Sequence, residues 1–219
     1  IDLKATDVTE LLSDIGFGPF EGSCVKAVPV SDMTCTRKQI DKLCADVEVI
    51  AGAKPYWFRL DEKGEIVGGI AKFLQAKKDE VIAALNLKPN TFVGLSSGKK
   101  SVAQKTMGAL IKQLGVLCPN HMDKEQYAFC WIVDFPMYEI GEESGELEFC
   151  HNPFSMPNGG LDILKKAQAG EADPLSITAF QYDVVCNGIE LSSGAVRNHD
   201  PEIMIEAFRM VKLGEEDVK

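Results

Sequence analysis

The stretch from Ala179 to His199 reads AFQYDVVCNGIELSSGAVRNH. Two runs rich in β-branched and aromatic residues flank Asn187-Gly188, and an Asn-Gly pair in that setting is the strongest short signal for a β-hairpin. The stretch therefore predicts two adjacent antiparallel strands joined by a two-residue turn. We expect its charged residues Asp183, Glu190 and Arg197 to lie on these strands.

The spacing of Glu190 and Arg197 raises a question of geometry. They are seven residues apart, so strict alternation along a strand would place them on opposite faces. Ser192-Ser193-Gly194 is a natural place for a β-bulge, which would bring both onto one face. There a carboxylate and a guanidinium could hold a metal-bound phosphate and a small carboxylate substrate. A surface ion pair explains the same two residues and remains open here.

A stiff polar loop precedes the hairpin. Residues 149–157 read FCHNPFSMP, and the two prolines restrict the backbone that presents His151 and Asn152. Rigid polar loops often line functional sites. His151 is therefore a candidate, although on its own it would be an ordinary loop histidine.

The first 120 residues alternate strand-like and helix-like segments, which predicts a compact α+β domain. Thr36 with Gln39 and Ser101 with Gln104 form capping-box patterns, so helices should begin near residues 37 and 101, and Gly115 should end the second. The β-favouring runs are residues 24–30, 56–60 and 91–95.

The polar stretch 119–123 predicts a boundary between a first domain, residues 1–122, and a second, residues 123–219. The second half should contain, in order, a strand at 127–133, an acidic loop at 139–148, a loop rich in proline, asparagine and glycine at 152–160, a short helix, the hairpin, and a closing helix from about residue 202.

Composition excludes several classes of protein. With 45% hydrophobic residues the 219-residue chain can bury ordinary cores, and it has neither a run long enough to cross a bilayer nor a secretory leader. The net charge of −10 argues against broad, non-specific nucleic-acid binding, so any RNA contact must be local. The seven cysteines never form C-x-x-C pairs, which predicts reduced, mostly buried thiols and a cytoplasmic location.

Both second-half motifs, residues 149–157 and 181–199, closely resemble catalytic-domain signatures of bacterial-type aspartyl-tRNA synthetases. The stretch WIVDFPMYE at 131–139 resembles the strand that precedes those signatures. The first half, with TRKQID at 36–41 and GALIKQLG at 108–115, resembles the GAD domain that is inserted in the catalytic domain of that family. The resemblance covers essentially the whole chain.

This resemblance implies an α+β fold in which a GAD-type insertion domain (1–122) precedes part of a class II catalytic domain (123–219), an antiparallel sheet flanked by helices. It implies an aspartate–tRNA ligase that activates L-aspartate with ATP and Mg²⁺ and transfers the aspartyl group to tRNA(Asp), with tRNA(Asn) left open as a second acceptor. It also implies a homodimer for the full-length protein, a cytoplasmic location and no membrane partner.

The resemblance also implies roles for individual residues. His151 matches the family's aspartate-contacting histidine, and Arg197 matches the arginine that binds the side-chain carboxylate of aspartate. Glu190 matches the carboxylate on the ATP side, where it would hold Mg²⁺ together with ATP, and Asp183 would orient this network. The planar fork of an arginine can pair both oxygens of aspartate, whereas asparagine would leave one donor unpaired.

The sequence departs from the family pattern in two ways. Many members have His-His-Pro-Phe where this chain has His151-Asn152-Pro-Phe, so we assign no role to Asn152, and its effect on the choice between tRNA(Asp) and tRNA(Asn) stays open. The chain also shows no anticodon-binding barrel and no motif 1, 2 or 3. Because the missing arginines would stabilise the ATP phosphates, we expect the isolated 219 residues to be inactive.

Two other functions fit part of the sequence. A GAD-like domain also occurs in a tRNA-dependent amidotransferase, so the chain could be a module that binds tRNA or protein without catalysis. An unrelated ATP-dependent, amide-forming ligase on the same fold would keep Glu190 but need not keep His151 with Arg197. Fold alone cannot separate these functions.

Overall fold

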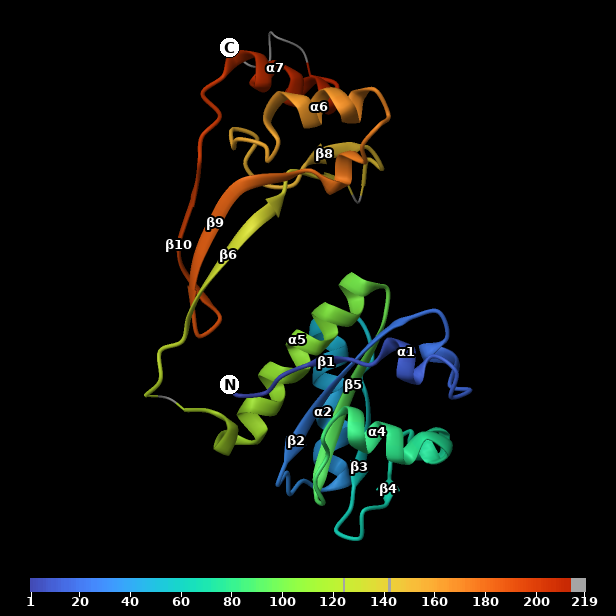
Figure 1. Ribbon diagram of the computed structural model, residues 1–219. Helices are drawn as coiled ribbons and strands as arrows, with labels where there is room; N and C mark the ends of the chain where they lie inside the picture. Colours follow the sequence, from blue (N-terminus) through green and yellow to red (C-terminus); the bar gives the residue numbers. More distant parts are fainter. Residues whose placement is uncertain (124, 142, 214–219) are drawn as a thin grey trace. The chain divides into compact units, whose positions relative to one another are not determined.

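The computed structural model describes residues 1–123, 125–141 and 143–213 (Figure 1). The chain divides into two compact units, Ile1–Glu125 and Gln126–Lys219, and each is described by itself. The division lies close to the predicted boundary. The assignment of the first unit to the GAD type stays a prediction, because no feature of the structure tests it.

The first unit is built on an antiparallel sheet with the strand order β1-β2-β5-β3-β4. Its strands are β1 (Thr6–Asp7), β2 (Cys24–Ser31), β3 (Tyr56–Leu60), β4 (Ile66–Val67) and β5 (Thr91–Gly98). Its helices are α1 (Thr9–Leu12), α2 (Arg37–Ala51), α3 (Ala71–Leu74), α4 (Lys78–Ala84) and α5 (Lys100–Leu117), with short 3₁₀ turns at Gly18–Phe20, Gln75–Lys77 and Pro119–His121. The three predicted strands are confirmed, and two of them extend further than predicted.

Each face of this sheet buries a separate apolar core. Val28 and Val30 of β2 pack with α2 and α5, whereas Val25 and Ala27 point to the opposite face and pack with α1, α3 and α4. On the α5 side, a Cβ atom at Gly94 would lie 2.7 Å from Cδ2 of Leu110. The glycine therefore lets α5 lie close against β5 (Figure 1).

The two predicted capping boxes differ in outcome. Thr36 caps α2 as predicted, since its side chain accepts a hydrogen bond from the Gln39 amide at 3.3 Å and its own amide donates to Gln39 Oε1 at 2.9 Å. The box at Ser101 is wrong. Helix α5 begins at Lys100, and its N-cap residue, Lys99, makes no side-chain capping bond. Strand β5 runs to Gly98 and turns directly into the helix, so Ser101 already lies in the first turn.

The predicted end of α5 at Gly115 is also wrong, because the helix continues to Leu117. Gly115 is buried, and a Cβ atom there would lie 2.7 Å from the side chain of Ile1. This glycine therefore makes room for packing rather than ending the helix.

The second unit combines a three-stranded antiparallel sheet, in the order β10-β9-β6, with a hairpin and two helices. The elements are β6 (Phe129–Pro136), β7 (Tyr138–Ile140), β8 (Leu147–Phe149), α6 (Gly160–Gln168), a 3₁₀ turn at Pro174–Ser176, β9 (Thr178–Cys186), β10 (Ile189–Ala195) and α7 (Pro201–Met210). Helices α6 and α7 and the β7–β8 hairpin share one core, in which the hydroxyl of the buried Tyr138 donates to the carbonyl of Ala207 at 3.0 Å.

The acidic loop predicted at residues 139–148 is wrong in part, because β7 and β8 pair there from Tyr138 with Phe149 to Ile140 with Leu147. The apolar side chains of Tyr138, Leu147 and Phe149 pack in the core and hold these short strands. Residue 142 of the predicted loop lies outside the described residues.

The three-stranded sheet exposes large apolar side chains. Strand β6 pairs only with β9 among the described residues, and its Phe129 and Trp131 are 65% and 63% exposed. Strands β9 and β10 expose Phe180, Tyr182, Ile189 and Leu191. An open, apolar sheet edge of this kind favours association with other chains.

The prediction that the cysteines are mostly buried is wrong. Only Cys118 and Cys186 are buried, Cys130 is exposed, and the remaining four, Cys24, Cys35, Cys44 and Cys150, are partly exposed. In the described part of the chain no helix has the length and apolar character needed to cross a membrane.

Candidate functional site

The predicted hairpin is confirmed. Asn187 and Gly188 both have positive φ angles, 50° and 79°, as a type I′ turn requires, and Ile189 pairs with Cys186. The side chain of Asn187 also fixes the start of β6, since its Oδ1 accepts a hydrogen bond from the Ala128 amide at 3.0 Å.

The bulge is also confirmed, at a slightly earlier position than predicted. Glu190 pairs with Val185 and Ser192 pairs with Val184, so Leu191 is the extra residue. Beyond it, Ser193 lies opposite Asp183. Glu190, Ser193 and Ala195 therefore share one face of the sheet with Asp183, and Arg197 follows in the same alternation.

A cavity of about 320 Å³ lies on this face, and all four predicted site residues, His151, Asp183, Glu190 and Arg197, line it. The other lining residues are Phe135, Asn152, Gln181, Ser193, Gly194 and Ala195. Within the residues that the structure describes, none of the four predicted side chains makes a hydrogen bond or ion pair with another residue. No ion pair joins Glu190 to Arg197, so the surface ion pair is not the reason for their placement.

The proline-containing loop fixes the backbone around Arg197. Ser155 forms a β-bridge with Arg197, the Met156 amide donates to the Val196 carbonyl at 2.9 Å, and the Asn198 amide donates to the Phe154 carbonyl at 2.8 Å. The loop thus pairs with the segment that follows β10. The backbone of Arg197 is therefore fixed, whereas its guanidinium has no hydrogen-bond partner among the described residues.

His151 enters the cavity from the same loop. Its ring lies edge-on to the ring of Phe135 on β6, with centroids 5.2 Å apart and an interplanar angle of 79°. This contact orients the imidazole while leaving its nitrogens without a protein partner among the described residues.

Gln181 is a residue of this cavity that was not predicted from the sequence. Its side chain is buried, and its Nε2 donates to Ser155 Oγ at 2.9 Å and to the Asn152 carbonyl at 3.2 Å. It lies two residues before Asp183 and therefore on the same face of β9. The spacing of two residues from Asp183 could have indicated that Gln181 faces the site. Its hydrogen-bond partner Ser155, 26 residues earlier in the chain, could not be identified in this way.

The donor set at this cavity suits a cation shared with a phosphate group better than a metal held by protein alone. Asp183 and Glu190 are its two carboxylates. No group of three or more His, Cys, Asp or Glu residues in the described ranges could hold a metal ion by itself. Mg²⁺ usually takes one or two carboxylates together with substrate phosphates, and two carboxylates fit that pattern.

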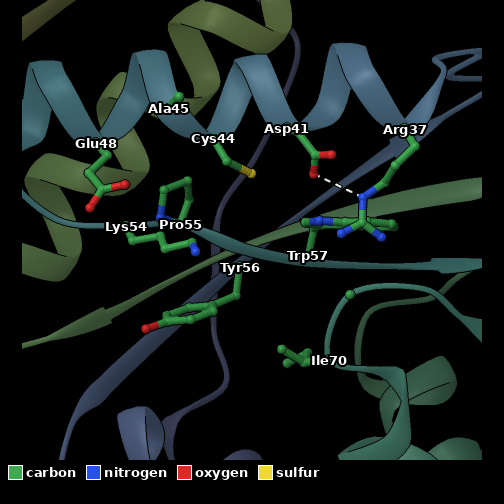
Figure 2. Close-up of a pocket in the computed structure, with 11 residues that line it drawn as sticks. Arg37, Asp41, Cys44, Ala45, Glu48, Lys54, Pro55, Tyr56, Trp57 and Ile70 are labelled. Atoms are coloured by element: carbon green, nitrogen blue, oxygen red, sulfur yellow. Dashed lines mark hydrogen bonds and ion pairs between the residues drawn. The ribbon is translucent and has the colours of Figure 1, made fainter.

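The first unit has a cavity of about 430 Å³ between α2 and β3, and none of the predicted site residues lines it (Figure 2). Two of its charged groups already have partners: Arg37 Nε donates to Asp41 Oδ1 at 2.9 Å, and the guanidinium lies 5.0 Å from the centre of the Trp57 ring. A neighbouring cavity of about 680 Å³ is larger still. Size alone therefore does not identify the site.

Comparison with known proteins decides the family. The sequence model of the family described as "tRNA synthetases class II (D, K and N)" matches residues 25–219. The chain belongs to the class II tRNA synthetases of this group. The resemblance seen in the sequence is therefore confirmed at the level of the family, and the antiparallel sheets with flanking helices agree with a class II synthetase region.

Individual relatives of this class II synthetase chain align with nearly its whole length. It is 42% identical over 219 residues to the aspartate–tRNA ligase of Streptomyces coelicolor, and the match covers 99% of this chain and 36% of the relative. It is 40% identical over 221 residues to the aspartate–tRNA(Asp/Asn) ligase of Rickettsia prowazekii, with 98% and 36% covered. The chain spans about a third of the length of these relatives.

Proposed function

We propose that this chain supplies the aspartate-binding part of an aspartate–tRNA ligase, which activates L-aspartate with ATP and Mg²⁺ and transfers it to tRNA. One observation carries the proposal. The side chains of His151, Asp183, Glu190 and Arg197 line one cavity of about 320 Å³ and make no hydrogen bond or ion pair with described residues, in a chain of which 99% aligns with a protein named aspartate–tRNA ligase.

Arg197 is the residue that would select the substrate. A guanidinium has five donors in a fixed plane and pairs both oxygens of a carboxylate. The side-chain carboxylate of aspartate offers two acceptor oxygens. The amide of asparagine offers one acceptor oxygen, and its NH₂ group would face an N–H donor of the guanidinium. The backbone pairing of Arg197 with Ser155 supports this role, because a fixed base lowers the cost of ordering the side chain on binding.

The two carboxylates would serve the ATP side of the reaction. Glu190 would hold Mg²⁺ together with the phosphates of ATP, and Asp183, on the neighbouring strand, would orient this network. His151 would contact the bound aspartate from the loop that forms another wall of the cavity. When bound, Mg²⁺ would neutralise charge that develops on the phosphates.

The remaining partners follow from the same proposal. The acceptor would be tRNA(Asp), and tRNA(Asn) is the second acceptor to test, because one relative is named for both. We place the enzyme in the cytoplasm as a homodimer. A first unit that binds tRNA or protein without catalysis, as a GAD-type module, is the competing function.

The test is aspartate-dependent exchange between ATP and pyrophosphate, measured with the complete protein that contains this chain. We expect exchange with aspartate and not with asparagine. Arg197→Ala should lower kcat/KM for aspartate about 100-fold or more, because it removes a charged, bidentate contact. Arg197→Lys should restore little of it. Arg37→Ala, which removes an arginine from the first unit, is the matched control and should leave exchange unchanged.

Two outcomes would contradict the proposal. If aspartate supports no exchange, the catalytic function fails and the binding module becomes the better explanation. If Arg197→Ala keeps full activity, the substrate site lies elsewhere. Charging of tRNA(Asp) and tRNA(Asn) transcripts by the same protein then separates the two acceptors, and the isolated 219 residues should show no steady adenylation.

A further inference from the structure

Two cysteines that are far apart in the sequence meet at one end of the first unit. Cys35 lies in the connection between β2 and α2, and Cys118 is the C-cap residue of α5. Both belong to the apolar cluster on the α5 side of the sheet, and both line one cavity of about 370 Å³.

The backbone at both positions is fixed by neighbouring groups. Nη2 of Arg59 donates to the Cys35 carbonyl at 2.7 Å. The Cys118 amide donates to the Leu114 carbonyl at 2.8 Å, and the Cys118 carbonyl accepts from the His121 amide at 3.0 Å. The backbone is therefore fixed at both residues that line this cavity.

The two thiols line one cavity and differ in access. Burial raises the pKa of the Cys118 thiol above its usual value, and the neighbouring Cys35 thiol raises it further through charge repulsion and a hydrogen bond. Cys118 is buried, with 9% of its surface exposed, whereas Cys35 is partly exposed. An oxidant in solution therefore reaches Cys35 more readily than Cys118.

We propose that Cys35 and Cys118 form a dithiol site that a low-molecular-weight disulfide, such as oxidised glutathione, converts to an intramolecular disulfide. The Cys35 thiolate attacks one sulfur of the small disulfide, which forms a mixed disulfide and releases one small thiolate. The Cys118 thiolate then attacks Cys35 Sγ and expels the second small thiolate. The two cysteines lose two electrons, and their two protons pass to the released thiolates.

This bond would change the stability of the first unit. The loop that it closes contains α2, β3, β4, α3, α4, β5 and α5, which is most of that unit. Joining the ends of so long a loop restricts the unfolded chain and raises the melting temperature. The inference does not depend on the proposed function, because neither cysteine lines the cavity that contains Arg197.

Cys44 provides the internal comparison. It is partly exposed, and burial raises its thiol pKa to about 11, with the Asp41 carboxylate as the next cause. It packs against the same apolar cluster but lines a different cavity, beside Trp57, in which no other cysteine lies. We therefore expect Cys44 to stay reduced under conditions that join Cys35 to Cys118.

The experiment exposes the reduced, complete protein to oxidised glutathione, blocks the remaining thiols with iodoacetamide, and maps tryptic peptides by mass spectrometry without reduction. We expect one cross-linked pair that contains Cys35 and Cys118, its loss on treatment with dithiothreitol, and a higher melting temperature for the oxidised protein. Cys118→Ser should stop at the mixed disulfide on Cys35, and Cys44→Ser should behave as the unmodified protein.

Three results would overturn the proposal. They are full alkylation of both cysteines after oxidation, a mixed disulfide on Cys35 that never closes in the unmodified protein, and a cross-link from either residue to another cysteine. The peptide map of the unmodified protein decides the question by itself if the serine variant does not fold.

Discussion

The side-chain amide of Gln181 donates a hydrogen bond to Ser155 Oγ at 2.9 Å and thereby joins strand β9 to the loop that carries His151. We predict that Gln181→Ala lowers the free energy of unfolding of the second unit by about 1–3 kcal/mol, because it leaves the buried Ser155 hydroxyl and the partly buried Asn152 carbonyl without their donor. It should also raise KM for aspartate more than it lowers kcat. Urea denaturation and exchange kinetics measure the two effects.

Gln168→Ala is the matched control for this prediction. The Gln168 amide also makes a hydrogen bond, to Glu206 Oε2 at 2.7 Å, but it does so on the exposed surface of α6. Its loss should change the free energy of unfolding by less than about 0.5 kcal/mol and leave KM unaltered. Equal effects from the two variants would mean that Gln181 does not organise the site.

Replacing two glycines in or beside α5 by alanine should change the free energy of unfolding of the first unit in opposite directions. Gly94→Ala places a Cβ atom 2.7 Å from the Leu110 side chain and should destabilise the first unit by about 1–3 kcal/mol. Gly108 lies exposed inside α5, and a Cβ atom added there would have no neighbour within 4 Å, so Gly108→Ala should stabilise by about 0.8–1 kcal/mol. Trp57 fluorescence during urea unfolding measures both, since the other tryptophan, Trp131, is already 63% exposed. Destabilisation by Gly108→Ala would contradict this packing.

The two capping-box sequences should also differ. Thr36→Ala removes a hydrogen-bonded cap from α2 and should lower the free energy of unfolding of the first unit by about 1 kcal/mol. Ser101→Ala removes a side chain that caps nothing and should stay within about 0.5 kcal/mol of the unmodified chain. Urea midpoints at constant m-value provide the comparison, and a large loss from Ser101→Ala would place the start of α5 at a different residue.

Tyr138 contributes to the stability of the second unit, and this contribution should decrease at alkaline pH. Burial raises the pKa of this phenol above its usual value of 10.0, so the folded state keeps the proton that the unfolded state loses first. The contribution is therefore complete below about pH 10 and falls as the pH rises further. We predict that Tyr138→Phe costs about 1–2 kcal/mol near pH 8, because the Ala207 carbonyl loses its donor.

The pH dependence separates this effect from simple loss of packing. The difference in unfolding free energy between the unmodified chain and Tyr138→Phe should shrink from about pH 10 to about pH 11. Tyr127→Phe is the control, because Tyr127 is 73% exposed and should show neither the cost nor the slope. A difference that stays constant across this range would show that the phenol of Tyr138 ionises normally.

Local sequence patterns predicted the structure correctly where it depends on near neighbours. The Asn187-Gly188 turn and the Thr36 cap involve contacts within three residues, and both are confirmed. The bulge could also be predicted locally. Glu190 and Arg197 are seven residues apart, so they can serve one site only if an extra residue between them brings both onto one face. The roles assigned to the site residues remain proposals.

Features that depend on distant parts of the chain were missed. Helix α5 begins within one residue of the predicted start, but its N-cap residue is Lys99 and not Ser101, because β5 pairs with β2 over eight residues and runs to Gly98. The spacing from Asp183 places Gln181 on the site's face of β9, but its hydrogen-bond partners Ser155 and Asn152 belong to a separate loop and could not be identified from the sequence. The β7–β8 hairpin was predicted as a loop because this stretch is rich in acidic residues. Its strands form because Tyr138 and Phe149 pack in the core.

Because Leu191 is a single extra residue in the ladder, the site depends on chain length as well as on residue identity. Inserting or deleting one residue between Glu190 and Arg197 would reverse the face on which one of them lies, even if every chemical group were retained. Natural or engineered variation in this hairpin should therefore take the form of replacements at constant length, and a library that varies it should hold the interval of seven residues fixed.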